Sequence, residues 1–405
     1  MNLLLPFALL FLSAQARAAG ALDFDQGRLD VAPFLQAPAP QARWTVMAYV
    51  NGKNDLERFA LQNVNAMEAA GSTPEVNVVV EMGRRGKAYG SDPVWSGVRR
   101  YLIKKDSDPG RITSPVLADM TADMGDANHL LEFARWARTA YPAEHTLLIV
   151  WDHGTGWLML APEPATKGIS YDYVTRNHIS TLQLGEVLSQ LGHLDIYASD
   201  ACRMQMASVA YELRGHADYI VGSEHVEPGD GYPYEAILAG LTAKPGSSPE
   251  DLARLIVRSY RDYYEKAGFE AVTQSALRGP ALPGFLERLN RWADLAMASG
   301  EKAVVRSALT SALQFRQDES RDLAHIVELV NAGTSREDLR RAGQELSAFL
   351  ERELIAANGV YGEAFRDAHG LAVYVPNSSY AQDYSRLSWA RDSRWDELLR
   401  WALDL

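Results

Sequence analysis

The sequence predicts an α/β protein with a largely parallel central sheet, followed by a mostly helical C-terminal region. Two patterns predict this fold. Between Trp44 and Gly222, short apolar runs alternate with segments of helical periodicity, which is typical of parallel strands covered by helices on both faces. After the Pro- and Gly-containing segment 244–249, the helical period predominates. We therefore expect an α/β domain over 44–245 and a mostly helical region over 246–405.

The first residues predict export. Leu3 to Leu12 is apolar and has about the length of a signal-peptide core, and Ala16-Arg17-Ala18 offers a cleavage site. We expect a signal peptide over 1–18 and delivery to the periplasm or the exterior of a bacterium. Residues 19–43 contain scattered prolines without a clear period, which predicts a linker or short pro-segment. No later segment has the length of a membrane-spanning helix.

The expected elements of the α/β domain follow one another in regular order. Residues 44–50 form a strand, and the helix after it, 55–70, places Leu56, Phe59, Val64 and Met67 on one face. Residues 76–82 are nearly all apolar, as expected of a strand buried on both sides. Further strands are expected at 98–103, 146–151, 194–202 and 219–222, and helices at 128–141, 181–191 and from Cys202 to about 214.

The C-terminal region shows mainly the period of amphipathic helices. We expect these helices at about 250–267, 283–299, 301–315, 322–332 and 335–357. A strand-like run at 370–375 precedes a last helix at 395–403.

The composition restricts the partners of the chain. Its 405 residues include 52 acidic and 40 basic side chains, with a formal net charge of −12. An acidic surface disfavours nucleic acid and anionic membranes as partners. It suits cationic substrates, although the solubility of an exported protein explains the charge without them. The single cysteine, Cys202, has no second cysteine to pair with, so an exported chain needs another use for its thiol, and catalysis is the use we predict.

Cys202 and His153 both follow expected strands. Ligands of largely parallel sheets collect at the carboxyl ends of the strands, where both residues are expected. A thiolate can attack a carbonyl carbon, and an imidazole can take the thiol proton and pass it to the leaving amine. We predict a cysteine-histidine hydrolase with Cys202 as nucleophile and His153 as acid and base. His178 and His225 are the next candidates for the base.

Glycine residues follow the histidine directly. Gly154 and Gly156 allow backbone N–H groups to approach a substrate closely. An oxyanion needs such donors, and we expect the N–H groups of Gly154 and Cys202 to supply them.

Asp200 lies two residues before the cysteine. A bare carboxylate beside the thiol would raise its pKa and oppose ionisation. The site should therefore contain a cation, either a fixed basic side chain or the Arg or Lys of a substrate, unless Asp200 only caps the turn. Asp230 could supply a second carboxylate. A metal site is a further alternative, although its residues follow no standard motif: Glu224, His225, Glu227 and Asp230.

Several motifs resemble the clostripain family of cysteine peptidases, relatives of caspases, gingipains and legumain. They occur in order over roughly residues 44–402, so the resemblance is specific although each motif alone is weak. The matching segments are Val46-Met47-Ala48-Tyr49-Val50, Asn54-Asp55-Leu56-Glu57, Asp152-His153-Gly154-Thr155-Gly156-Trp157, Ser199-Asp200-Ala201-Cys202, Ala217-Asp218-Tyr219-Ile220-Val221-Gly222-Ser223-Glu224, Glu227-Pro228-Gly229-Asp230-Gly231-Tyr232 and Gly370-Leu371-Ala372-Val373-Tyr374-Val375-Pro376, with the segment around Trp395.

The resemblance implies a caspase-like α/β/α sandwich with a dyad of Cys202 and His153. It implies cleavage of peptides after Arg or Lys, with Asp200 and Asp230 forming the acidic primary pocket. No cofactor is expected for this chemistry, but some members of the family require calcium, so the resemblance leaves a calcium requirement open.

Two further expectations concern processing and departures from the family. Members are often self-cleaved between the histidine and the cysteine, where Lys167 and Arg176 lie. Arg203 follows the cysteine where other members commonly have Leu. A cation there could partly neutralise Asp200 and change the specificity.

Two alternatives stay open from the sequence. The same site could have another specificity or catalyse transpeptidation. The chain could instead be a catalytically silent secreted binding protein that keeps the fold. Peptides that differ only in the residue before the scissile bond would distinguish the possible specificities. Failure of a thiol reagent to label Cys202 would favour the silent binding protein.

Overall fold

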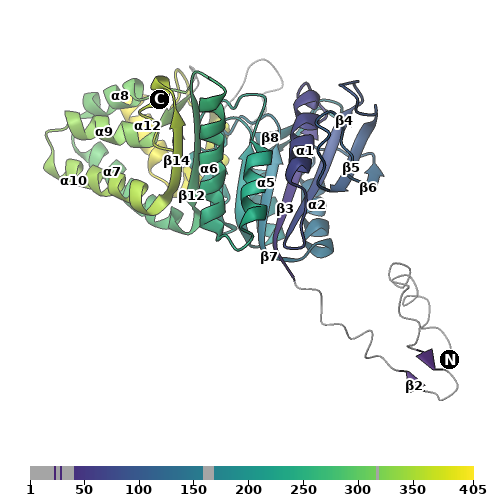
Figure 1. Cartoon of the computed structure of the whole chain (residues 1–405). Helices are drawn as coiled ribbons and strands as arrows, with labels where there is room; N and C mark the ends of the chain where they lie inside the picture. Colours follow the sequence, from purple (N-terminus) through teal and green to yellow (C-terminus); the bar gives the residue numbers. More distant parts are fainter. Residues whose placement is uncertain (1–21, 24–27, 30–40, 158–167, 316–318) are drawn as a thin grey trace, which may run out of the picture. The chain divides into compact units, whose positions relative to one another are not determined.

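The computed structural model of the chain describes residues 22–23, 28–29, 41–157, 168–315 and 319–405 (Figure 1). It divides into two compact units, Met1–Gln41 and Ala42–Leu405. In the first unit, β1 (Leu22–Asp23) pairs antiparallel with β2 (Arg28–Leu29). The expected signal peptide lies outside the described residues. Among the described residues, no helix is long and apolar enough to cross a membrane.

A nine-stranded sheet runs through the second unit, in the order β14-β12-β11-β10-β7-β3-β4-β5-β6. The central strands from β11 to β4 are parallel, and antiparallel strands extend both edges. The largely parallel sheet predicted from the apolar runs is confirmed. Its strands are β3 (Ala42–Gly52), β4 (Val76–Arg85), β5 (Ser96–Leu102), β6 (Val116–Met120), β7 (Ala143–Trp151), β10 (Leu194–Asp200), β11 (Ala217–Gly222), β12 (Val272–Arg278) and β14 (Ile355–Tyr361).

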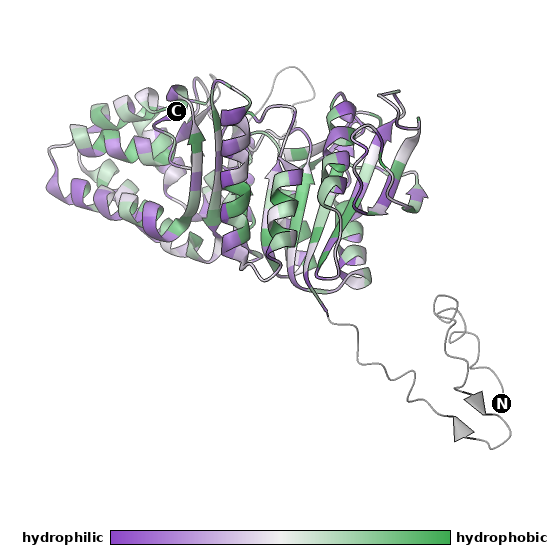
Figure 2. Ribbon diagram, viewed as in Figure 1, coloured by the Kyte–Doolittle hydropathy of each residue, from purple (hydrophilic) through white to green (hydrophobic). Residues whose placement is uncertain are grey.

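Helices cover both faces of this sheet, and alternate residues of the central strands enter two separate cores. On β3, Val46, Ala48 and Val50 belong to one core, and Met47 and Tyr49 belong to the other, as the two-residue period of a strand requires. Figure 2 shows the hydrophobic colour concentrated on the strands between the helical layers. One layer contains α1 (Glu57–Ala70), α5 (Tyr234–Ala243) and α6 (Pro249–Lys266), and the other contains α2 (Ala127–Ala140), α3 (Thr181–Leu191) and α4 (Ala207–Glu212).

The C-terminal region is not a separate helical unit, which corrects the expected boundary at residue 246. β12 and β14 lie beyond that residue and extend the central sheet next to β11. The helix expected over 335–357 is wrong only at its end, because α10 (Glu337–Phe349) continues as a π-helical segment to Leu354 and Ile355–Tyr361 forms β14. These strands escape prediction because polar residues interrupt their apolar pattern, such as the buried Gln274 of β12 and the Asn358 of β14.

The remaining helices of this region contribute to the core that α2, α3 and α4 cover. They are α7 (Leu282–Ala298), α8 (Lys302–Ser311), α9 (Leu323–Gly333), α10 (Glu337–Phe349), α11 (Ser388–Asp392) and α12 (Trp395–Leu403). The same region contains the short 3-10 helices η3 (Gly279–Ala281), η5 (Glu363–Phe365) and η6 (Gln382–Arg386) and the π-helical segment η4 (Leu350–Leu354). Two small antiparallel pairs complete the unit: β8 (Gly168–Asp172) with β9 (Asn177–Ser180), and β13 (Ser320–Asp322) with β15 (Ala372–Tyr374).

Candidate active site

The carboxyl ends of β7 and β10 carry the two residues predicted for catalysis. These strands are parallel neighbours, and Trp151 at the end of β7 pairs with Asp200 at the end of β10. His153 and Cys202 each follow two residues later in the chain. The imidazole and the thiol therefore leave the same edge of the sheet, from adjacent strands.

Gly154 packs directly against the backbone of Cys202. A Cβ atom at residue 154 would lie 2.5 Å from the carbonyl oxygen of Cys202 and 3.1 Å from its nitrogen. Backbone atoms do not yield to such contacts, so the loops after β7 and β10 can approach this closely only with glycine at this position. The approach brings the backbone amides of Gly154 and Cys202 into one small region, as a shared oxyanion site needs.

His153 is held by Asp55, whose role the sequence pattern did not predict. The Nε2 atom of His153 lies 2.8 Å from Oδ1 of Asp55, and the imidazole stacks on Tyr173 with ring centroids 6.1 Å apart. Burial lowers the pKa of His153, but the hydrogen bond with Asp55 and the charge of Asp152 outweigh it, so the pKa is raised overall. Because Asp55 accepts the Nε2 proton, Nδ1 remains as the basic nitrogen of the neutral ring.

The strand order of the sheet explains the position of Asp55. Asp55 follows β3, which is the parallel neighbour of β7. Residues that follow neighbouring parallel strands meet at one edge of the sheet. An acidic residue after β3 is therefore close to a histidine after β7.

A buried carboxyl group supports the start of the histidine loop. Asp152 accepts hydrogen bonds from the side-chain amides of Asn54 at 2.5 Å and Asn51 at 3.2 Å, and from the Tyr171 N–H. Burial raises the pKa of Asp152 to about 7, against the opposing effects of the His153 charge and these hydrogen bonds. These contacts fix the backbone immediately before the imidazole.

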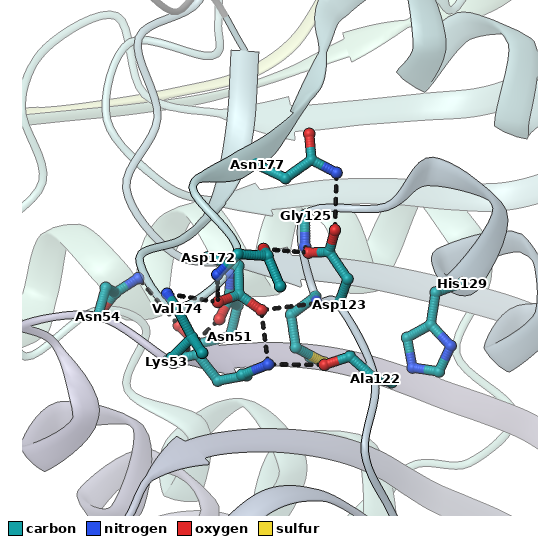
Figure 3. Close-up of polar contacts among 12 residues, drawn as sticks. Asn51, Lys53, Asn54, Ala122, Asp123, Gly125, His129, Asp172, Val174 and Asn177 are labelled. Carbon is teal, nitrogen blue, oxygen red and sulfur yellow. Dashed lines mark hydrogen bonds and ion pairs between the residues drawn. The ribbon is translucent and has the colours of Figure 1, made fainter. Parts of the chain in front are cut away.

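A buried ion pair joins the loop after β3 to the β8–β9 hairpin. Figure 3 shows the Lys53 ammonium pointing at Asp172, with Nζ 2.8 Å from the carboxylate and 2.6 Å from the carbonyl oxygen of Ala122. Asp172 also accepts the N–H groups of Met124 and Val174. Both charged side chains are buried, so removing one would leave the other without its counter-charge, which is strongly destabilising.

Cys202 lies against the backbone of Glu227. The Glu227 N–H group donates to Sγ at 3.3 Å, and Sγ lies 3.8 Å from the Glu227 carbonyl oxygen. Burial raises the pKa of the thiol, while this N–H group and the charge of Arg203 lower it, and the pKa is raised overall. The thiol is therefore neutral at rest and needs a base. Arg203, expected as a partner for Asp200, thus acts on the electrostatics of Cys202.

Asp200 is buried at the end of β10. Its Oδ2 atom accepts hydrogen bonds from the Tyr232 N–H at 3.0 Å and the Tyr234 hydroxyl at 2.8 Å. Burial raises the pKa of Asp200, although the side chain of Glu227 and these donors partly lower it. This carboxyl group thus lies in the interior, two residues from the thiol.

Asp230 has a different environment from Asp200. It is exposed, its carboxylate accepts a hydrogen bond from Tyr263, and its carbonyl oxygen accepts one from Asn63 at 2.8 Å. Glu227, and not Asp230, is the residue of this loop whose side chain contacts Asp200.

The four residues considered as metal ligands do not converge on one point. The Glu224 side chain contacts Asp322, the Glu227 side chain contacts Asp200, the ring of His225 lies against Phe365, and Asp230 is exposed. Among the described residues, one group has candidate ligand atoms that all lie within 4.8 Å of one another. It consists of His193, Asp195 and Asp218, near the amino ends of β10 and β11 and opposite the catalytic edge.

Two further sequence-predicted residues, His178 and Arg176, lie in the β8–β9 hairpin. His178, on β9, stacks on Tyr171 with ring centroids 5.1 Å apart, and burial lowers its pKa. Arg176 occupies the turn of the hairpin with a φ of 60°. Lys167 lies outside the described residues.

Comparison with known families identifies relatives over most of the chain. The profile of the Clostripain family matches residues 48–401. Clostripain from Hathewaya histolytica is 28% identical over 229 residues, which are 51% of this chain and 44% of that protein. The chain therefore spans less than half the length of this relative.

Solved structures share the fold. A secreted C11 cysteine protease from Bacteroides thetaiotaomicron, in complex with an irreversible peptide inhibitor, superposes with a TM-score of 0.67 and 23% identity, covering 88% of this chain and 100% of that chain. An inactive zymogen C11 protease from Parabacteroides distasonis gives a TM-score of 0.65 and 22% identity, covering 87% of this chain and 98% of that one. The predicted caspase-like α/β/α sandwich is confirmed.

Proposed function

The chain belongs to the clostripain family of cysteine peptidases, and we propose that it is an endopeptidase that cleaves after Arg or Lys. The observation that carries this proposal is the pairing of Trp151 with Asp200, which puts His153 and Cys202 at the same edge of adjacent strands. The contact of Gly154 with the Cys202 backbone supports a common oxyanion site beside them.

The proposed reaction proceeds through a thioester. Nδ1 of His153 takes the proton of the Cys202 thiol, and Sγ attacks the carbonyl carbon of the peptide. The N–H groups of Gly154 and Cys202 stabilise the oxyanion. The imidazolium, held through Nε2 by Asp55, then gives the proton to the leaving amine. Water, deprotonated by the same imidazole, hydrolyses the thioester and releases the acid product.

An arginyl electrophile tests both the nucleophile and the substrate preference. We expect mass spectrometry of the intact protein to show one adduct on Cys202, the single cysteine of the chain. A matched norleucyl electrophile should react far more slowly. No adduct with either reagent would favour the silent binding protein. Equal labelling by both would favour another specificity, and product analysis with added amine would reveal transpeptidation.

Replacement of Asp200 should reduce activity selectively. A buried carboxylate can form a charge-assisted pair with a substrate guanidinium, and losing such a pair costs about 2–4 kcal/mol of transition-state binding. We therefore expect Asp200→Asn to lower kcat/KM for Arg and Lys substrates by about 30- to 1000-fold. Neutral substrates should lose much less, because the thiol also loses a nearby negative charge.

Asp230→Asn is the matched control for this measurement. Its carboxylate is exposed and bonded to Tyr263, so its loss should change kcat/KM for basic substrates less than the loss of Asp200 does. Equal losses for basic and neutral peptides in Asp200→Asn would show that Asp200 is only structural. A larger selective loss of kcat/KM for basic substrates in Asp230→Asn would show that Asp230, and not Asp200, binds the basic side chain.

We expect self-processing to use Lys167 and not Arg176. Proteases bind the cleaved segment in an extended form, whereas Arg176 lies in a hairpin turn whose flanking residues, Asp172 and Asn177, are paired. We expect gel electrophoresis and mass spectrometry of the purified protein to show two fragments, produced by cleavage after Lys167, that stay associated. Lys167→Gln and Cys202→Ala should stay intact, and Arg176→Gln should still be cut. An active single chain would refute a processing requirement.

We also propose export through the segment 1–18.

Two positions among the described residues have ligands that do not suit calcium. Calcium takes about six to eight oxygen ligands, whereas the group of His193, Asp195 and Asp218 offers one imidazole and two carboxylates. In the loop after β3, the Lys53 ammonium already balances the buried Asp172. Neither position fits a calcium ion.

A further inference from the structure

A half-exposed tyrosine of the β8–β9 hairpin lies beside the imidazole of His153. The ring of Tyr173 is nearly parallel to the imidazole, with an interplanar angle of 10° and ring centroids 6.1 Å apart. Tyr173 is nevertheless 49% exposed, and the next residue, Val174, is 60% exposed. The Tyr173 ring therefore contacts the imidazole assigned as the base and still offers a large part of its surface to a second molecule.

Contacts on both sides of Tyr173 hold its ring in place. Its N–H group donates to the Lys53 carbonyl oxygen at 3.0 Å, and its hydroxyl group donates to Asp55. The turn that follows is fixed by Asp172, which accepts the Val174 N–H at 2.9 Å and pairs with the Lys53 ammonium (Figure 3). The ring is thus positioned before a substrate arrives, and little ordering is needed when one binds.

The proposed reaction determines which part of a substrate lies on this side of the site. The acyl part becomes attached to Sγ of Cys202. The nitrogen of the scissile bond receives its proton from the imidazolium of His153, so it must come within hydrogen-bond distance of that ring. This nitrogen belongs to the residue after the scissile bond. The side chain of that residue is therefore within reach of Tyr173, whose ring centroid is 6.1 Å from that of the imidazole.

The chemistry of this surface suits an apolar or aromatic side chain. A tyrosine ring offers a large apolar area, and contacts between aromatic rings are favourable beyond the area that they bury. The hydroxyl group of Tyr173 is engaged with Asp55, so the ring is the part left for a substrate. The carboxylate of Asp55 is 63% exposed beside the same imidazole, and its negative charge disfavours an acidic side chain there.

We infer that Tyr173 is a specificity-determining residue, which contacts the side chain after the scissile bond and favours an aromatic or large apolar residue at that position. This inference rests on the proposed peptidase reaction of His153 and Cys202. It concerns the leaving side of the cleaved bond, and so it adds a second preference to the one proposed for Arg or Lys on the acyl side. It also gives the β8–β9 hairpin a part in substrate binding.

Paired peptide substrates test this inference. Two internally quenched peptides share Arg before the scissile bond and differ only in the residue after it, which is Phe in one and Ser in the other. We expect kcat/KM of the full-length wild-type protein to be about 5- to 10-fold higher for the Phe peptide, the size of effect that an aromatic contact supplies. Tyr173→Ser should make the two values equal, whereas Tyr173→Phe keeps the ring and should keep the preference.

Two controls separate substrate binding from support of the imidazole. A blocked arginine ethyl ester has no residue after the scissile bond, so it measures how far Tyr173→Ser disturbs His153 itself. The ratio between the two peptides is free of that loss, because both depend on the same imidazole. Val174→Ser is the matched variant, since Val174 is the more exposed residue of the same turn and the Tyr173 ring is the one that stacks on the imidazole. It should keep the preference for Phe.

The outcomes distinguish this inference from the proposed function. Equal kcat/KM for the two peptides in the wild-type protein would overturn the role of Tyr173 and leave cleavage after Arg intact, and this result needs no variant to fold. A preference that survives in Tyr173→Ser, or that is lost in Val174→Ser, would also overturn it. If neither the peptides nor the ester were cleaved, the proposed function itself would be wrong, and the role of Tyr173 with it.

Discussion

Cys202→Ala should lower kcat/KM by about 10⁵-fold or more, because the nucleophile of a covalent mechanism has no substitute. The backbone N–H groups and the substrate pocket remain, so peptide binding should persist while turnover stops. The loss in folding free energy should be small, about 1 kcal/mol, because the side chain is short and its main polar contact is the Glu227 N–H. Initial rates and thermal unfolding, measured on the same preparation, check both statements.

The single cysteine makes the control for this prediction direct. A thiol reagent should add one label to the wild-type protein and none to Cys202→Ala, because no other cysteine is present. Cys202→Ser keeps a hydroxyl at the same position and should also be nearly inactive, since the hydroxyl ionises far less readily. Turnover by unlabelled Cys202→Ala protein at more than a trace level would refute the assigned nucleophile.

The α/β core could be predicted because its physical pattern is local. The strand Val76–Arg85 is buried on both faces, and most of its residues from 76 to 82 are apolar. The strands β12 and β14 could not be predicted, because they pair with segments far apart in the chain and their sequences carry polar residues. A boundary placed at residue 246 from composition alone therefore cuts through one sheet.

The site likewise divides into residues that a local sequence pattern predicts and residues whose contacts depend on distant segments. His153 and Cys202 could be placed together because each ends a recognisable strand of a parallel sheet. Asp55 and Glu227 come from loops, and their partners are set by strand order and loop path, which a single sequence does not encode locally. Asp200 is buried and Asp230 is exposed, and this difference between two residues of the same type could not be predicted from the sequence.

His153→Ala should lower kcat/KM by about 10³- to 10⁴-fold, nearly as far as loss of the cysteine. The pKa of the Cys202 thiol is raised by burial, so little thiolate forms without a base, and the leaving amine also loses its proton donor. The double variant His153→Ala, Cys202→Ala should resemble Cys202→Ala, because the two side chains act as a unit. Activity of His153→Ala within a few-fold of wild type would show that another base serves, with His178 the next to be replaced.

Asp55→Asn separates the orientation of the imidazole from its presence. The asparagine can keep a hydrogen bond to Nε2 but carries no charge, so it no longer stabilises the imidazolium that Asp55 now stabilises. We expect kcat/KM to fall by about 10- to 100-fold, less than for His153→Ala. Because the pKa of His153 falls when this charge is removed, the acidic limb of the pH profile should move to lower pH. A purely structural Asp55 would reduce the rate without that displacement. The direction of the limb therefore decides whether the 2.8 Å contact between Asp55 and His153 takes part in proton transfer or only holds the loop after β3 in place.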